Sequence, residues 1–160
     1  MGQFFYFSKT YIYFSRIMSY MIIQNLFIFA FLGVLGAIDV MTYDKEKGYI
    51  PSILTSTYIL IALIIAGSGA LYGGLIALAA AFVFNDLEMW AGWADFKIYV
   101  GTSIIIADPI GVLIFSFSLS FVAFFYKWIA KYRFKAEVIP FIPAVFVAYA
   151  LFLLLSYLWI

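Results

Sequence analysis

The chain has 160 residues, of which 68% are apolar and only 11% are charged, and its mean hydropathy is +1.12. Soluble domains average roughly 45–50% apolar and about 25% charged residues, so this chain lacks the polar side chains that a water-facing surface needs. It contains no cysteine and no histidine, which excludes thiol nucleophiles, Cys/His zinc sites and Ser-His-Asp triads. The net charge of +1 gives no reason to expect a nucleic-acid partner.

The predicted fold is all-α, a polytopic bundle of transmembrane helices. A hydrocarbon core about 30 Å thick takes ~20 residues of helix, so about six spans with short loops would use nearly the whole chain. We therefore expect one membrane domain over residues 21–160. Residues 1–20 carry Lys9, Arg16 and several serines at helical spacing, which indicates an amphipathic helix lying in the interface. A start at a later methionine is the alternative.

Proline and glycine divide this domain into elements. Pro51 suits the first turn of a helix, because its φ is fixed and it lacks a backbone donor. Gly67-Ser68-Gly69 predicts a tight turn, and Asp108-Pro109 predicts another. The predicted spans run over about 21–42, 51–66, 70–84, 95–107, 110–126 and 139–157.

Lysine and arginine set the expected orientation, because cytoplasmic loops carry an excess of both. The loops after the first, third and fifth spans, the last being a basic loop over 127–137, hold or border these residues, whereas the other two loops hold none. We therefore expect the odd-numbered loops on the cytoplasmic side of the cell membrane. The residues concerned are Lys45, Lys47, Lys97, Lys127, Lys131, Arg133 and Lys135.

Two aspartates stand where a long apolar stretch meets a short polar one. Asp44 follows the first predicted span and Asp95 opens the fourth, so antiparallel packing could set both carboxylates at one membrane level. Two carboxylates that share a proton supply both the base and the acid that peptide hydrolysis by water requires, and this chemistry needs no metal or other cofactor. Gly92 and Ala94 are small, so the backbone near Asp95 could approach a substrate strand closely.

Three short segments carry a resemblance to a known family. Residues 44–51 place an aspartate seven residues before the proline of an Ile-Pro pair, with Lys47 between them, and residues 92–97 read Gly-Trp-Ala-Asp-Phe-Lys. Residues 139–143 read Ile-Pro-Phe-Ile-Pro. In this order the segments resemble the type IV prepilin peptidase family, above all its archaeal preflagellin and prepilin branch, whose second motif is Gly-x-Gly-Asp-x-Lys. The resemblance covers residues 21–160.

The resemblance implies an aspartic endopeptidase of the Gly-x-Gly-Asp type, which removes short basic leader peptides from prepilin-like and preflagellin-like proteins. It puts Asp44 and Asp95 in the catalytic positions. Ala94 departs from the second motif glycine and adds a methyl group beside Asp95. The cysteine-bearing loop of many bacterial members is missing, so their N-methyltransferase activity is not expected. Presenilin and the signal peptide peptidases have similar short elements but more spans, and this alternative ranks below the prepilin peptidase family.

Asp39 is the main rival of Asp44, because an ionisable side chain inside a span is a candidate for function. On a continuous helix the two lie about 7.5 Å apart along the axis and roughly 140° apart around it, so they cannot share one face. Asp39 lacks the spacing to the Ile-Pro pair, and its plainer interpretation is a buried hydrogen-bond acceptor between helices. The same span has small residues for close helix packing, namely Gly33, Gly36 and Ala37.

Three further polar residues are candidates for supporting the site or binding substrate. Asp86 and Glu88 lie in the polar stretch before Asp95, where they would bind the basic residues of a leader or stand as solvated charges near a helix end. Lys97 lies two residues after Asp95, so on a helix its side chain points elsewhere. Its plainer role is to anchor the helix at the lipid headgroups by snorkelling.

Two other classes of function stay open. Membrane carboxylates also relay protons, and short glycine-rich helices can line a pore, so a small proton-coupled transporter or channel is the main alternative. A non-catalytic subunit of a membrane assembly is the other. Under the peptidase hypothesis the expected partners are prepilin-like substrate proteins and the lipid bilayer, while the sequence predicts no oligomeric state.

Overall fold

The computed structural model describes residues 23–42, 50–86, 93–129, 131–132 and 140–158. The chain divides into two compact units, Met1–Phe31 and Leu32–Ile160. The described part of the first unit is the apolar beginning of a helix, Ile23–Thr42, on which the rings of Phe27 and Phe31 lie 6.1 Å apart. The second unit holds every other described element.

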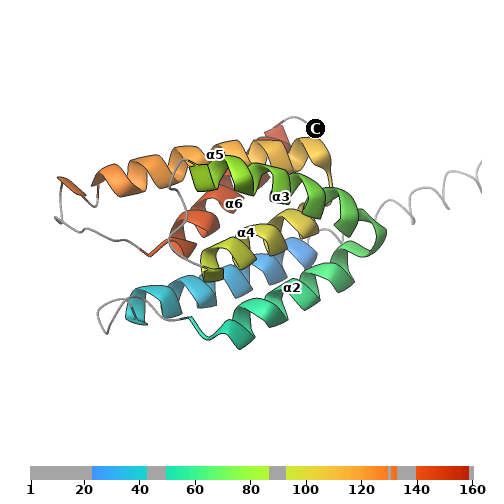
Figure 1. The fold of residues 1–160 in the computed structure, drawn as a ribbon, viewed down its shortest axis with the longest axis horizontal. Coiled ribbons are helices and arrows are strands. Elements are labelled where there is room, and N and C mark those ends of the chain that lie inside the picture. The colour runs from blue at the N-terminus through green and yellow to red at the C-terminus, as the bar shows by residue number, and fades with distance from the viewer. Residues whose placement is uncertain (1–22, 43–49, 87–92, 130, 133–139, 159–160) are drawn as a thin grey trace, which may run out of the picture. The chain divides into compact units, whose positions relative to one another are not determined.

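The second unit is all-α throughout its described residues, which confirms the predicted fold class. It contains the rest of the first helix, five further α-helices and one short 3-10 turn (Figure 1). Their bounds are Ser52–Ala66 for α2, Gly67–Gly69 for the turn η1, Ala70–Asp86 for α3, Trp93–Ile106 for α4, Pro109–Ile129 for α5 and Ile142–Leu158 for α6.

The predicted breaks between helices are confirmed. Pro51 directly precedes α2, and its carbonyl oxygen accepts a hydrogen bond from the N–H of Leu54 at 2.9 Å. Gly67 ends the same helix with a φ of 53°, a left-handed conformation that glycine adopts without a steric penalty. Asp108 directly precedes α5 and caps its start, because its side-chain Oδ2 accepts a hydrogen bond from the N–H of Gly111 at 2.6 Å.

Two helices run further than the sequence predicts. We expected spans to end near 84 and 126, whereas α3 continues to Asp86 and α5 to Ile129. The prediction ended each span at its first polar or charged residue, although a helix ends at a residue that disfavours helical backbone rather than at a charge. Lys127 therefore belongs to the last turn of α5 and not to a basic loop.

Helix α4 lies between α2 and α3 (Figure 1). A β-carbon added to Gly73 of α3 would overlap the backbone oxygen of Ser103 on α4. On the other side, a β-carbon added to Gly101 of α4 would come within 2.8 Å of the Tyr58 ring on α2. The absence of side chains at these two glycines lets the helices approach closely, and this close packing fixes the position of α4.

Three stretches of the described residues are long and apolar enough to cross a bilayer, which identifies the chain as a membrane protein. They are Ile23–Thr42, Ser52–Ala80 and Pro109–Ile129. The second stretch contains the bend at Gly67, and α4 has only 14 residues, or about 21 Å of helix. The count of six spans therefore stays a prediction.

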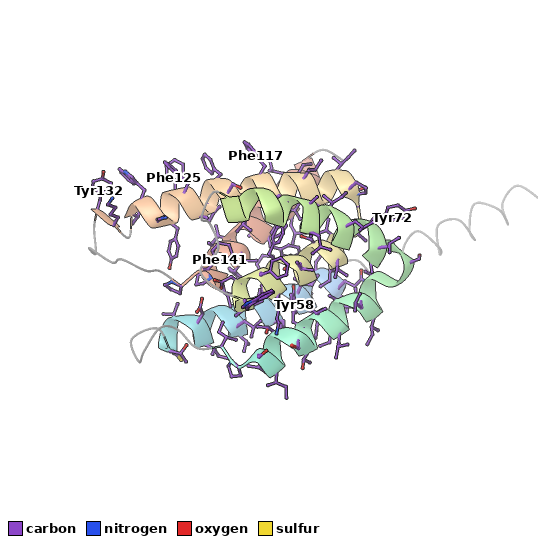
Figure 2. All side chains as sticks on the ribbon, in the orientation of Figure 1. Tyr58, Tyr72, Phe117, Phe125, Tyr132 and Phe141 are labelled. Carbon is purple, nitrogen blue, oxygen red and sulfur yellow. The ribbon has the colours of Figure 1, made fainter. Side chains whose placement is uncertain are left out.

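Large aromatic side chains stand along the outer edge of the bundle, on α5 and at Tyr132 just after it. The side chains of Phe117, Phe125 and Tyr132 point away from the bundle along this edge (Figure 2). Phe117 and Tyr132 are 76% and 70% exposed. The large aromatic side chains at these positions thus face outward from the bundle.

Candidate active site

Asp95 lies in the first turn of α4 and is only 7% exposed. This position puts the carboxylate near the positive end of the helix dipole. Two residues before it, Trp93 is 79% exposed and its ring meets Phe96 edge-on at 5.7 Å. Ala94, which replaces the motif glycine, is half-buried. The start of α4 therefore places a buried carboxylate beside an exposed aromatic surface.

Lys97 contacts α2 rather than lying free among headgroups. Its Nζ donates hydrogen bonds to Ser52 Oγ at 2.7 Å and to Ser56 Oγ at 3.2 Å. Lys97 is half-buried and both serines are exposed. We did not predict these partners of Lys97 from the sequence, although the sequence contains a pattern that indicates them. Two serines spaced by four residues stand in the first two turns of α2, on one face of that helix.

Asp39 is a buried hydrogen-bond acceptor between two helices, which was the plainer interpretation of its place in the sequence. Its carboxylate is 6% exposed, and Oδ2 accepts a hydrogen bond from the N–H of Ile142, at the start of α6, at 3.1 Å. Pro143 has no N–H, and those of Ala144 and Val145 bond to the carbonyl oxygen of the residue before α6. Asp39 therefore satisfies the one remaining backbone donor of this first turn.

The predicted small-residue face of the first helix packs against the same part of α6. A β-carbon added to Gly36 would lie 3.8 Å from the backbone nitrogen of Pro143, and one added to Gly33 would lie 3.7 Å from the ring of Phe146. The bond from Asp39 and the contacts of these glycines together form a joint between the first helix and α6.

Several predicted site residues lie outside the described residues, among them Asp44, Glu88 and Gly92. Asp86 is the last residue of α3. The structure describes the two ends that flank the segment carrying Asp44. Thr42 ends the first helix, and Ile50, which is 6% exposed, leads into α2. The end of the first helix and the beginnings of α2, α4 and α6 gather toward the left of the second unit (Figure 1).

The centre of the bundle contains hydroxyl pairs that the sequence interpretation missed. The hydroxyl of Tyr58 pairs with Thr102 Oγ1 at 3.0 Å, and that of Tyr99 pairs with Ser116 Oγ at 2.7 Å. All four residues are buried. Their presence inside apolar spans was the available signal, because buried hydroxyls in membrane helices usually bond across helices. Both pairs hold α4 in place, through α2 and through α5.

The chemistry open to this region is that of carboxylates, hydroxyls and one ammonium group. Within the described residues, no three acidic side chains gather as a metal site would need. Comparison with family models, with curated proteins and with solved structures found no match.

Proposed function

We propose that this chain is a membrane aspartic endopeptidase of the prepilin peptidase type, which removes short basic leader peptides from prepilin-like or preflagellin-like proteins. The observation that carries the proposal is the buried carboxylate of Asp95 in the first turn of α4, within a Gly-x-x-Asp-x-Lys segment. Asp44 is its proposed partner, seven residues before Pro51.

In the proposed reaction one of the two carboxylates is ionised and takes a proton from water. The water attacks the carbonyl carbon of the scissile peptide bond, and the other carboxyl group, which is protonated, polarises the carbonyl oxygen. Proton transfer to the departing nitrogen completes the cleavage, so a pair that holds one proton supplies both the base and the acid. The charges of such a pair interact strongly at the edge of a membrane, where the dielectric constant is low.

The fixed ends of the Asp44 segment support this pairing. Before the segment, Asp39 joins the first helix to the start of α6. After it, Lys97 joins the start of α2 to the second turn of α4. Both anchors lie at the end of the bundle where α2, α4 and α6 begin (Figure 1).

The proposal also includes an orientation. The protein crosses the cell membrane several times, with the loops that carry lysine and arginine in the cytoplasm. A substrate would keep its apolar helix in the bilayer and extend its basic leader along the cytoplasmic face, where the start of α4 would lie. The exposed indole of Trp93 and the serines at the start of α2 would then be within reach of the peptide.

Incubation with a panel of prepilin-like substrates tests the proposal. The purified full-length protein in proteoliposomes is mixed with each substrate, and the N-terminus of every product is read by mass spectrometry. We expect one new N-terminus directly after a basic leader. A panel that stays intact in the presence of folded protein contradicts the proposal.

A small proton-coupled transporter is the second candidate, and the buried hydroxyl pairs favour it. Tyr58 with Thr102 and Tyr99 with Ser116 place exchangeable protons in the middle of the bundle. A proton relay needs such groups inside the bilayer. Proton flux into liposomes, measured with a pH-sensitive dye in the absence of cleavage, would support transport over proteolysis.

A further inference from the structure

The side chain of Lys97 joins two helices at the polar edge of the candidate site. Its ammonium group bonds to Ser52 Oγ at 2.7 Å and to Ser56 Oγ at 3.2 Å. The serines are four residues apart on α2 and therefore lie one above the other on one face of that helix. An ammonium group carries three N–H donors, so it can bond to both hydroxyls at once.

The place of this contact in the chain connects it to the proposed catalytic pair. Helix α2 begins directly after Ile50, which is buried, and Pro51, whose φ is −54°. The chain thus enters α2 along a packed and stiff path. Lys97 stands two residues after Asp95 on α4. The contact ties the helix that follows the Asp44 segment to the helix that carries Asp95.

We propose that Lys97 is a positioning residue for the aspartic peptidase reaction. Held by the two serine hydroxyls, its ammonium group fixes the start of α2 against α4 and so holds the helix that carries Asp95 in place. The inference rests on the proposed function, because it assigns a role within the same site. Two carboxylates that share a water tolerate little displacement, since a misplacement of about 1 Å can lower a rate roughly 100-fold.

Two other roles for Lys97 make different predictions. A serine and a lysine can act as nucleophile and general base, and 2.7 Å to Ser52 is within reach for that proton transfer. A lysine that acts as a base is desolvated in an apolar pocket, whereas Lys97 is half-buried beside two exposed serines. Snorkelling, the role predicted from the sequence, needs neither serine.

Substitution kinetics separate these roles. The full chain in proteoliposomes is assayed for leader cleavage with Lys97→Met, Lys97→Arg and the double variant Ser52→Ala/Ser56→Ala. We expect Lys97→Met and the double variant to lower kcat by about 10- to 100-fold with little change in KM, because substrate still binds while the pair is misplaced. Lys97→Arg keeps most of kcat, because a guanidinium group also donates to both hydroxyls. Lys127→Met, at the exposed end of α5, is the matched control and keeps full activity.

Each rival role gives its own pattern. Catalysis by a serine–lysine pair makes Lys97→Arg inactive and lets Ser52→Ala alone abolish cleavage. In the positioning role Ser52→Ala costs less than the double variant, because Ser56 still accepts a hydrogen bond. Snorkelling leaves the double variant fully active. Either rival pattern overturns the positioning role.

A distance measurement makes the test independent of cleavage. The chain has no native cysteine, so spin labels on Ile53→Cys of α2 and Trp93→Cys of α4, at positions 74% and 79% exposed, report a single distance distribution and leave both aspartates in place. We expect Lys97→Met to shift or broaden this distribution and Lys97→Arg to leave it narrow. An unchanged distribution in Lys97→Met overturns the inference. A shifted distribution in a protein that cleaves no substrate retains the bridge and overturns the peptidase function alone.

Discussion

Two buried aspartates of this protein lie in different surroundings. Asp39 is 6% exposed and Asp95 is 7% exposed. Asp39 faces the start of α6, where Phe141 and Ile142 are 8% and 0% exposed. Asp95 stands in the first turn of α4, two residues after the exposed Trp93. One carboxylate is bonded into the joint between two helices, and the other stands at the beginning of a helix.

The difference teaches that burial alone does not identify a catalytic carboxylate in a membrane helix. The hydrogen bond of Asp39 satisfies a backbone donor of α6, so the fold accounts for this side chain. An acid in the first turn of α4 also stabilises its helix, by about 0.3–1 kcal/mol at an exposed site, but that effect does not require burial. Asp95 is buried near the beginning of a helix whose first residue, Trp93, is exposed, and the proposed function needs a carboxylate that a peptide can approach.

The largest expected effect is at Asp95. Asp95→Asn removes a titratable group while it keeps the size of the side chain, so leader cleavage should fall by about 10²–10⁴-fold. Insertion and thermal stability should change little. The matched control is Asp108→Asn, which keeps an acceptor oxygen for the N–H of Gly111 and should stay active. Cleavage by Asp95→Asn at the wild-type rate removes this residue from the proposed pair.

The next largest effect concerns the position of α4. Gly73→Ala places a methyl group against the backbone oxygen of Ser103, so the helices must separate, and we expect a loss of about 3 kcal/mol in unfolding free energy. Gly74→Ala is the control, because its β-carbon would lie 3.7 Å from the nearest atom. Unfolding in detergent measures both variants. Equal stability of the two would mean that α3 and α4 do not approach as closely as described.

Variants of Asp39 test whether its hydrogen bond to the start of α6 stabilises the fold. Asp39→Leu leaves the buried N–H of Ile142 without its acceptor and should lower the unfolding free energy by about 2 kcal/mol. Asp39→Asn keeps an acceptor oxygen and should retain most of the stability and the cleavage rate per folded molecule. If Asp39→Asn is folded but inactive, Asp39 and not Asp44 is the partner of Asp95.

The smallest expected effect is at a hydroxyl pair in the bundle centre. Tyr58→Phe removes the bond to Thr102 but leaves the bond from Thr102 to the carbonyl oxygen of Ile98, so about 1 kcal/mol of stability should be lost. Tyr72→Phe, at a position 61% exposed, should have no measurable effect. Loss of proton flux in Tyr58→Phe, with no loss of stability, would favour the transporter.

Much of this fold could be predicted from local signals in the sequence. Gly67 and the Asp108-Pro109 pair break the helical pattern because of their backbone preferences, and these preferences act within a few residues. The packing of Gly33 and Gly36 and the acceptor role of Asp39 followed from small and ionisable residues inside an apolar span.

What the sequence did not predict depends on which helices become neighbours. The serines that bond to Lys97 are 45 and 41 residues away, and no periodicity within α4 points to them. The pairing of Tyr58 with Thr102 is non-local in the same way. The late end of α5 was missed for another reason, because a charge was taken as the end of a helix. The pairing of Asp44 with Asp95 stays a prediction.

Cross-linking of Asp44→Cys to Asp95→Cys tests the central claim most directly. Because the chain has no other cysteine, a short bifunctional thiol reagent that links the two within one molecule shows that they meet. We predict this internal link in intact membranes with reagents that span about 10 Å or less, well under the ~30 Å thickness of the hydrocarbon core. The account is contradicted if both cysteines react singly, yet no reagent shorter than the bilayer joins them.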